Sequence, residues 1–261
     1  MNYKKIIKDA LIGYIGFLLV VSVFQSFFIY HPKTVDSYDI KHLNEIGAIS
    51  VSENSVEWLY LPAQLKPQNK ILIYFHGNAG MAIDRVWKTS FWQRNGFDVV
   101  LTEYPSYGTN KGSLSEKSFY KAGRIIINKT KLDFPNADIY IYGESIGSGT
   151  AVQMASEYDE IALIIEAGFS SLVDVAFSKM PIIPVKLLLN DKYESVKKIN
   201  KIDSRLIVIH GQKDNVVPLK FGQKLFDAYN GEKEIHILDS AGHNDIYQKQ
   251  DMNTWIRELE L

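Results

Sequence analysis

The chain has 261 residues, of which 46% are hydrophobic and 12% aromatic, and its formal net charge is −1. This length is ample for one large α/β domain, and the near-neutral charge gives no indication of a nucleic-acid partner. The absence of cysteine excludes disulfides, thiol nucleophiles and cysteine-based metal sites, and the six histidines show no metal-ligand spacing.

Residues 10–30 carry no charged side chain. As a helix, this segment would be about 31 Å long, close to the hydrocarbon thickness of a bilayer. Tyr30 and the His31-Pro32 pair end it as an interfacial anchor and a helix breaker would. The segment predicts a single transmembrane anchor. A cleaved signal peptide, with a small-residue motif at 20–22, and a buried helix of a soluble protein are the alternatives.

Lysines on the N-terminal side of this segment favour an N-terminus kept in the cytoplasm, with the body of the protein on the non-cytoplasmic side. The difference in positive charge between the two sides is small, because lysines also follow the segment. The lysines before it are Lys4, Lys5 and Lys8, and those after it are Lys33 and Lys41. We expect three parts: a cytoplasmic stub with a transmembrane anchor at 1–31, a linker at 32–46 and a folded domain at 47–261.

Beyond residue 46, short apolar segments alternate with amphipathic ones. The predicted strands are 48–52, 55–61, 71–75, 97–102, 138–142, 161–165, 205–209 and 234–238, the first two forming a hairpin. Helices are expected up to about residue 95, over 115–131, after Ser145, after residue 218 and at the end of the chain. This alternation predicts an α/β fold, with a mostly parallel central sheet covered by helices on both faces.

The strand at 138–142 runs into Gly143-Glu-Ser-Ile-Gly147, which matches the pattern Gly-x-Ser-x-Gly. This pattern is typical of a strained corner between a strand and a helix, with the serine at its apex. The corner would present the Ser145 hydroxyl and leave the Ile146 N–H free at a helix N-terminus. The pattern alone is weak, because a glycine-rich turn with an idle serine also matches it.

The loops that follow the other predicted strands carry further polar residues. They hold His76-Gly-Asn78, Asp214 and His243, and each loop leaves its strand at the carboxyl end. In a parallel sheet these ends meet at one edge, where ligands bind. The sequence therefore predicts one site that combines these residues with Ser145.

A serine nucleophile needs a base, and the base needs an acid that orients it. His243, in the loop after the last strand, is the expected base. Asp214 is the expected acid, and Glu166, which also ends a strand, is its rival. Less favoured candidates, more typical of loop capping or solvated charge, are Asp245, Asp174 and Asp239.

An oxyanion hole needs two backbone donors. We expect the N–H groups of Ile146 and Asn78 in this role, with Ala79 as the near alternative to Asn78. His76 and His210 each follow an apolar strand directly and are expected to orient loops. Glu144, inside the corner, is expected to make structural hydrogen bonds.

Five motifs occur in the order found in one superfamily. They are His76-Gly-Asn-Ala-Gly80, Glu103-Tyr-Pro-Ser-Tyr-Gly108, Gly143-Glu-Ser-Ile-Gly147, His210-Gly-Gln-Lys-Asp214 with Val217-Pro218, and Gly242-His243. From about residue 25 the chain resembles the α/β-hydrolase superfamily, and more narrowly its membrane-anchored branch of Bem46-like and ABHD-type serine hydrolases. The resemblance implies the α/β-hydrolase fold and acyl hydrolysis by Ser145, Asp214 and His243. It also implies no metal and no organic cofactor. Glu103 departs from the family, whose members often have Asp there.

Hydrolysis through an acyl-enzyme could act on an ester, a thioester or an amide. Residues 172–200 fit a small lid that faces acyl groups or a membrane, or equally an ordinary core helix with a kinked approach. A lid together with an anchor favours lipid-like acyl groups or acylated proteins as substrates. The alternatives are a serine peptidase or amidase, and a catalytically silent binding protein with the same fold.

Overall fold

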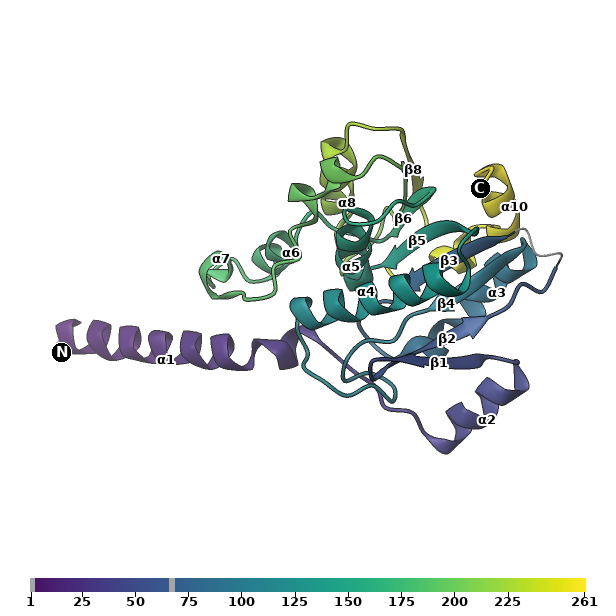
Figure 1. Cartoon of the computed structure of the whole chain (residues 1–261). Coiled ribbons are helices and arrows are strands. Elements are labelled where there is room, and N and C mark those ends of the chain that lie inside the picture. Colours follow the sequence, from purple (N-terminus) through teal and green to yellow (C-terminus); the bar gives the residue numbers. More distant parts are fainter. Residues whose placement is uncertain (1–2, 66–68) are drawn as a thin grey trace.

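The computed structural model describes residues 3–65 and 69–261 (Figure 1). Its strands are β1 (Ile49–Glu53), β2 (Val56–Leu61), β3 (Lys70–Phe75), β4 (Phe97–Leu101), β5 (Asp138–Glu144), β6 (Ala162–Glu166), β7 (Arg205–Gly211) and β8 (Lys233–Leu238). They form one sheet in the order β1-β2-β4-β3-β5-β6-β7-β8. The β1–β2 and β2–β4 pairs are antiparallel and all the other pairs are parallel. The predicted hairpin and the mostly parallel sheet are confirmed.

The helices occupy the segments between these strands and both ends of the chain. They are α1 (Tyr3–Ile29), α2 (Ser37–Glu45), α3 (Val86–Arg94), α4 (Glu116–Asp133), α5 (Ile146–Ala155), α6 (Leu172–Lys179), α7 (Val185–Leu188), α8 (Leu219–Ala228), α9 (Ile246–Lys249) and α10 (Met252–Glu258). The segment expected to be a linker contains α2, and bridges from Pro32 to Gly80 and from Thr34 to Gly108 tie it to the body.

Both faces of the sheet are buried, which explains why its parallel strands have almost continuous apolar sequences. In β3, Ile71 and Ile73 point into a core that includes side chains of α4, α5 and α8. Leu72 and Tyr74 point to the opposite side, where they pack with side chains of α3, α9 and α10. Alternate residues of a strand face opposite ways, so this one strand supplies both cores.

Helix α1 projects away from the body, and α6 and α7 extend from the body on the same side (Figure 1). Apart from a few positions, α1 is solvent-exposed, and by length and composition it can cross a membrane. The predicted lid segment contains α6, α7 and two short 3₁₀ turns, Ser195–Lys197 and Ile199–Lys201. The long apolar helix and residues 172–200, the segment called the lid below, therefore share one end of the molecule.

Candidate active site

Ser145 lies at the corner between β5 and α5, with a φ of 52° that is unusual for a residue other than glycine. Space is tight on both sides of it. A Cβ added at Gly143 would lie 2.6 Å from the Cβ of Ala151, and one at Gly147 would collide with the carbonyl oxygen of Phe75. These close approaches explain why the two positions are glycine.

The side chains of Ser145, His243 and Asp214 form a continuous chain of hydrogen bonds. His243 Nε2 lies 3.0 Å from Ser145 Oγ, and His243 Nδ1 lies 2.6 Å from Asp214 Oδ2. The three residues come from the loops after β5, β7 and β8, whose carboxyl ends meet at one edge of the sheet. This geometry allows His243 to accept the serine proton while the carboxylate holds the imidazole in one tautomer.

Asp214 is held as a carboxylate by its surroundings. Its Oδ1 accepts hydrogen bonds of 2.8 Å from the N–H groups of Val216 and Val217. Burial by itself would raise the pKa of Asp214, but hydrogen bonds from His210 and His243 outweigh it and hold the pKa below its usual range. Asp214 therefore remains an ionised hydrogen-bond acceptor for His243 Nδ1.

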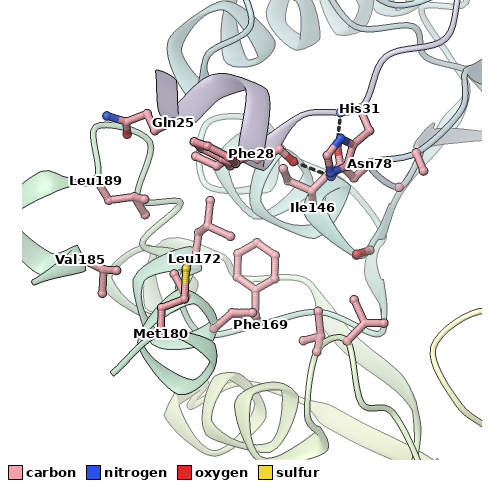
Figure 2. Close-up of a pocket in the computed structure, with 18 of the residues that line it drawn as sticks. Gln25, Phe28, His31, Asn78, Ile146, Phe169, Leu172, Met180, Val185 and Leu189 are labelled. Carbon is pink, nitrogen blue, oxygen red and sulfur yellow. Dashed lines mark hydrogen bonds between the residues drawn. The ribbon is translucent and has the colours of Figure 1, made fainter. Parts of the chain in front are cut away.

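The N–H groups of Ile146 and Asn78 face no protein acceptor within the described part of the chain. Ile146 is the first residue of α5, where helical hydrogen bonding leaves the N–H unused. The Asn78 side chain binds the end of α1: its Oδ1 accepts from the His31 N–H at 3.1 Å, and its Nδ2 donates to the Ile29 carbonyl (Figure 2). The same Oδ1 also accepts from the Tyr107 hydroxyl at 2.8 Å.

Glu166, the rival acid, is engaged elsewhere. Its carboxylate lies 2.8 Å from Lys88 Nζ and accepts a 2.7 Å hydrogen bond from the Tyr142 hydroxyl. Lys88 Nζ also lies 3.2 Å from Glu144, which pairs with Arg85 as well. Two cations and two carboxylates thus neutralise one another below the Ser145 corner. The structure gives Glu144 the structural hydrogen bonds that the sequence predicted.

The less favoured acids serve local structure. Asp245 accepts a 2.6 Å hydrogen bond from the Gly242 N–H, and Asp174 pairs with Lys224 at 2.8 Å. Asp239 is exposed. Within the described chain, none of the three forms a hydrogen bond or ion pair with His243, and Asp214 is the carboxylate that reaches this imidazole.

His76 and His210 tie loops together, as the sequence predicted. His76 Nε2 lies 3.0 Å from Glu103 Oε1, and its Nδ1 lies 2.7 Å from the Gly77 carbonyl oxygen. His210 Nε2 lies 2.8 Å from the Val217 carbonyl oxygen. Glu103, the residue that departs from the family, therefore fixes the loop that carries Asn78.

Comparison with known proteins places the chain in a family. Xenopus laevis alpha/beta hydrolase domain-containing protein 17B is 30% identical over 181 residues, which cover 67% of this chain and 60% of that protein. The chain belongs to the α/β-hydrolase superfamily. It spans about 60% of the length of this relative and of its Homo sapiens counterpart. No family model matches the chain.

Solved structures of α/β-hydrolases share the fold. A Pyrococcus furiosus esterase superposes with a TM-score of 0.65 at 17% identity, covering 89% of this chain and 96% of that one. An α/β-hydrolase from Vibrio vulnificus gives a TM-score of 0.66 at 15% identity, covering 87% and 86%. At these identities the likeness concerns the fold alone.

In this α/β-hydrolase, Ser145 and His243 lie in a cavity of about 740 Å³. That volume is within the usual range of small-molecule sites. The lid contributes much of its apolar lining: Leu172, Val175, Ala176, Met180, Ile183, Val185, Leu188 and Leu189. Within the described residues, no group of three or more acidic or histidine side chains is arranged to hold a metal ion.

Helix α1 supplies the opposite wall, which the sequence analysis did not anticipate. Its lining residues are Phe17, Val21, Ser22, Gln25, Phe28 and Ile29. A signal was present in the sequence, because Tyr14 and Gln25 are hydrogen-bonding residues eleven positions apart in the uncharged segment 10–30. That spacing places both on one helical face.

Proposed function

We propose that this chain is a serine hydrolase that cleaves ester or thioester bonds of acyl substrates through an acyl-enzyme intermediate. Membership of the α/β-hydrolase superfamily supports hydrolase activity. The observation that carries the finer proposal is the hydrogen-bonded series Ser145–His243–Asp214 at the base of a largely apolar cavity. Such an enzyme resembles a carboxylesterase, lipase or thioesterase.

In the first step, Ser145 Oγ attacks the carbonyl carbon while His243 Nε2 takes its proton. The negative charge that develops on the carbonyl oxygen is stabilised by the Ile146 and Asn78 N–H groups. His243 then gives the proton to the departing alkoxide or thiolate. Water, activated by the same imidazole, attacks the acyl-enzyme and releases the acid.

The surroundings of the site indicate the kind of acyl group. The cavity is lined mainly by aliphatic and aromatic side chains of α1 and the lid, so the acyl part of the substrate is lipid-like. Helix α1 can anchor the enzyme in a membrane. Lys4, Lys5 and Lys8 favour an N-terminus in the cytoplasm and a hydrolase domain on the other side.

The full chain in detergent should be labelled by a fluorophosphonate probe and should hydrolyse p-nitrophenyl esters. Ser145→Ala should abolish labelling and lower kcat by about 10⁴-fold or more, because the nucleophile is lost. His243→Ala should have a similar effect on kcat. More than about a tenth of the activity remaining in Ser145→Ala would contradict the assignment. Cleavage of amides in preference to esters would indicate a peptidase. A wild-type protein that neither hydrolyses esters nor reacts with fluorophosphonate would indicate a binding protein.

A further inference from the structure

One face of α1 is turned toward the lid. Tyr14, Leu18, Val21 and Gln25 recur at intervals of four, three and four residues, which aligns them along one side of a helix. Leu18 packs against the apolar cluster of lid residues Val173, Ile183 and Val185. A helix that served only as a tether would need no such face.

Hydrogen bonds fasten this face to the lid. Gln25 Nε2 donates to the Leu188 carbonyl at 3.2 Å, and Gln25 Oε1 accepts from the Asn190 N–H at 2.8 Å. Further along, the Tyr14 hydroxyl donates to the Ile182 carbonyl at 2.6 Å. Gln25 is only 5% exposed, although most of α1 is open. An amide buried among apolar groups is costly unless it is paired, so these bonds specify how α1 and the lid fit together.

The end of α1 and the two residues after it are fixed to Asp191 and to the loop that carries Asn78. The Tyr30 hydroxyl donates to Asp191 Oδ2 at 2.8 Å, just after the lid helices. The Asn78 side chain holds the Ile29 carbonyl and the His31 N–H from the loop of the proposed oxyanion hole. The position of α1 is thus set relative to both the lid and the reacting serine.

Between α1 and the lid lies the apolar part of the cavity. Figure 2 shows Phe28 of α1 on one side of it and Phe169, Leu172 and Met180 on the other. Ile146, from the corner that carries Ser145, also lies within this view. The space between the two walls leads to the serine hydroxyl.

We propose that α1 is part of the substrate-binding site. Its lid-facing side forms one wall of a chamber that holds the apolar chain of a membrane-resident acyl substrate, and Tyr14 and Gln25 keep the lid in register with it. The inference rests on the proposed function, because that function puts the scissile bond at Ser145.

The surroundings of the chamber identify the membrane as the source of the chain. Ile182 and Leu187 at the tip of the lid are 78% and 86% exposed, next to a helix that can cross a bilayer. Irregular backbone tolerates an apolar environment only where protein groups satisfy its polar atoms. Tyr14 and Gln25 do this for the carbonyls of Ile182 and Leu188. Substrate therefore enters sideways, from lipid into the space between α1 and the lid.

Two adjacent phenylalanines provide a matched test. Phe28 lines the cavity, whereas Phe27 does not, and they are similarly exposed at 64% and 72%. With the full chain in lipid nanodiscs, kcat/KM is measured for p-nitrophenyl acetate and p-nitrophenyl palmitate. Phe28→Ala should lower the palmitate-to-acetate ratio about tenfold, the usual cost of lost apolar contact in a binding pocket. Phe27→Ala should leave this ratio within about twofold.

Equal effects of the two substitutions, or no effect of either, would overturn the role of α1. Failure of the proposed function looks different, because the wild-type protein would then hydrolyse neither ester and fluorophosphonate would not react with Ser145. A second experiment measures ligand binding without turnover and so can be read even if neither ester is hydrolysed.

The chain has no cysteine, so Val21→Cys and Val20→Cys each create a single thiol. Val21 lines the cavity and Val20 is exposed outside it. In detergent, palmitate should slow maleimide labelling of Val21→Cys severalfold and leave Val20→Cys unchanged. Gln25→Ala, introduced into the Val21→Cys chain, should reduce this protection, because the lid loses two hydrogen bonds to α1. Equal protection of the two cysteines would mean that palmitate binds around α1 as detergent does, and it would overturn the proposal.

Discussion

At the scale of single residues, the sequence offers two carboxylates that could orient His243, Asp214 and Glu166. Their hydrogen bonds distinguish them. Asp214 lies 2.6 Å from the imidazole Nδ1. Glu166 is fully buried on β6, and its charge is already balanced by Lys88 at 2.8 Å. A carboxylate paired with an ammonium group contributes little to stabilising a distant imidazolium.

Substituting each of the two carboxylates tests which one orients His243. Asp214→Asn should lower kcat for ester hydrolysis by about 10³–10⁴-fold, because an amide neither fixes the reactive tautomer nor stabilises the imidazolium. Glu166→Gln should reduce stability more than turnover, measured as kcat per folded molecule. A severe loss for Glu166→Gln together with a mild one for Asp214→Asn would transfer the acid to β6.

Glu160, which lies between α5 and β6, makes stability depend on pH. Burial, opposed by the hydrogen bond from Ser204, raises its pKa from 4.5 to about 7. The folded state therefore binds this proton more tightly than the unfolded chain does. The contribution of Glu160 to the stability of the folded state is fully present below about pH 4.5 and is lost as the pH rises through about 7.

In the wild-type protein, the Ser204 hydroxyl donates to Glu160 Oε1 at 2.7 Å. Glu160→Gln should abolish the decrease in stability, because the amide stays neutral and its oxygen can still accept this hydrogen bond. We expect the thermal midpoint of the variant to exceed that of the wild type at pH 8 and to match it at pH 5. Asp159→Asn, at the exposed neighbouring position, serves as the control and should shift the midpoint much less. A gain of equal size at both pH values would show that the cause is not titration of Glu160.

At the scale of elements, the corner between β5 and α5 rests on the buried cluster of Arg85, Lys88, Glu144 and Glu166. Burial would lower the pKa of Lys88, but the charges of Glu166 and Glu144 outweigh it and raise the pKa. Helix α3 supplies the lysine, while β5 and β6 supply the carboxylates. The cluster therefore fixes α3 to β5, which leads into the Ser145 corner, and to the neighbouring strand β6.

Lys88→Met should destabilise the protein by about 3–5 kcal/mol, because it leaves a buried carboxylate without its partner. Lys197→Met, which removes an exposed ion pair with Glu194, is the matched control and should cost less than about 1 kcal/mol. Thermal unfolding of the detergent-solubilised full chain measures both. Equal losses would show that the buried cluster contributes no more to stability than a surface pair.

At the scale of the whole molecule, the apolar helix, the lid and the sheet meet at one end (Figure 1). A bilayer around α1 would therefore also lie close to the mouth of the cavity. The carboxyl edge of the sheet, where Ser145 lies, faces that same region. If α1 crosses a membrane, the arrangement therefore brings the cavity close to the lipid.

We expect α1 to remain attached and to hold the hydrolase domain outside the cytoplasm. Membrane fractions should keep the full chain through a carbonate wash, and removal of residues 1–30 should release it. Protease added to intact cells or spheroplasts should degrade the domain that follows Tyr30. A soluble protein starting near Val23 would indicate a cleaved signal peptide, and membrane-bound protein protected from protease would reverse the topology.

The sequence by itself determined the strands of the sheet and their order along the chain, but not α2, which lies in the segment expected to be a linker. Strands such as 138–142 follow from local apolar patterns, and a Gly-x-Ser-x-Gly corner needs glycines whatever lies around it. The meeting of Ser145, Asp214 and His243 could be predicted as well. Parallel strands bring their carboxyl ends to one edge, so the positions of these loops depend on topology more than on packing.

Only the tertiary structure decided which distant side chains pair. The engagement of Glu166 by Lys88, and of Gln25 by Leu188 and Asn190, joins segments between 78 and 165 residues apart. No local pattern encodes such pairs, because each depends on how whole elements pack and on what burial costs an unpaired polar group. For the same reason the sequence could only predict a membrane helix at residues 10–30, whereas the contacts of α1 with residues 172–200 show that this helix also forms a wall of the cavity around Ser145.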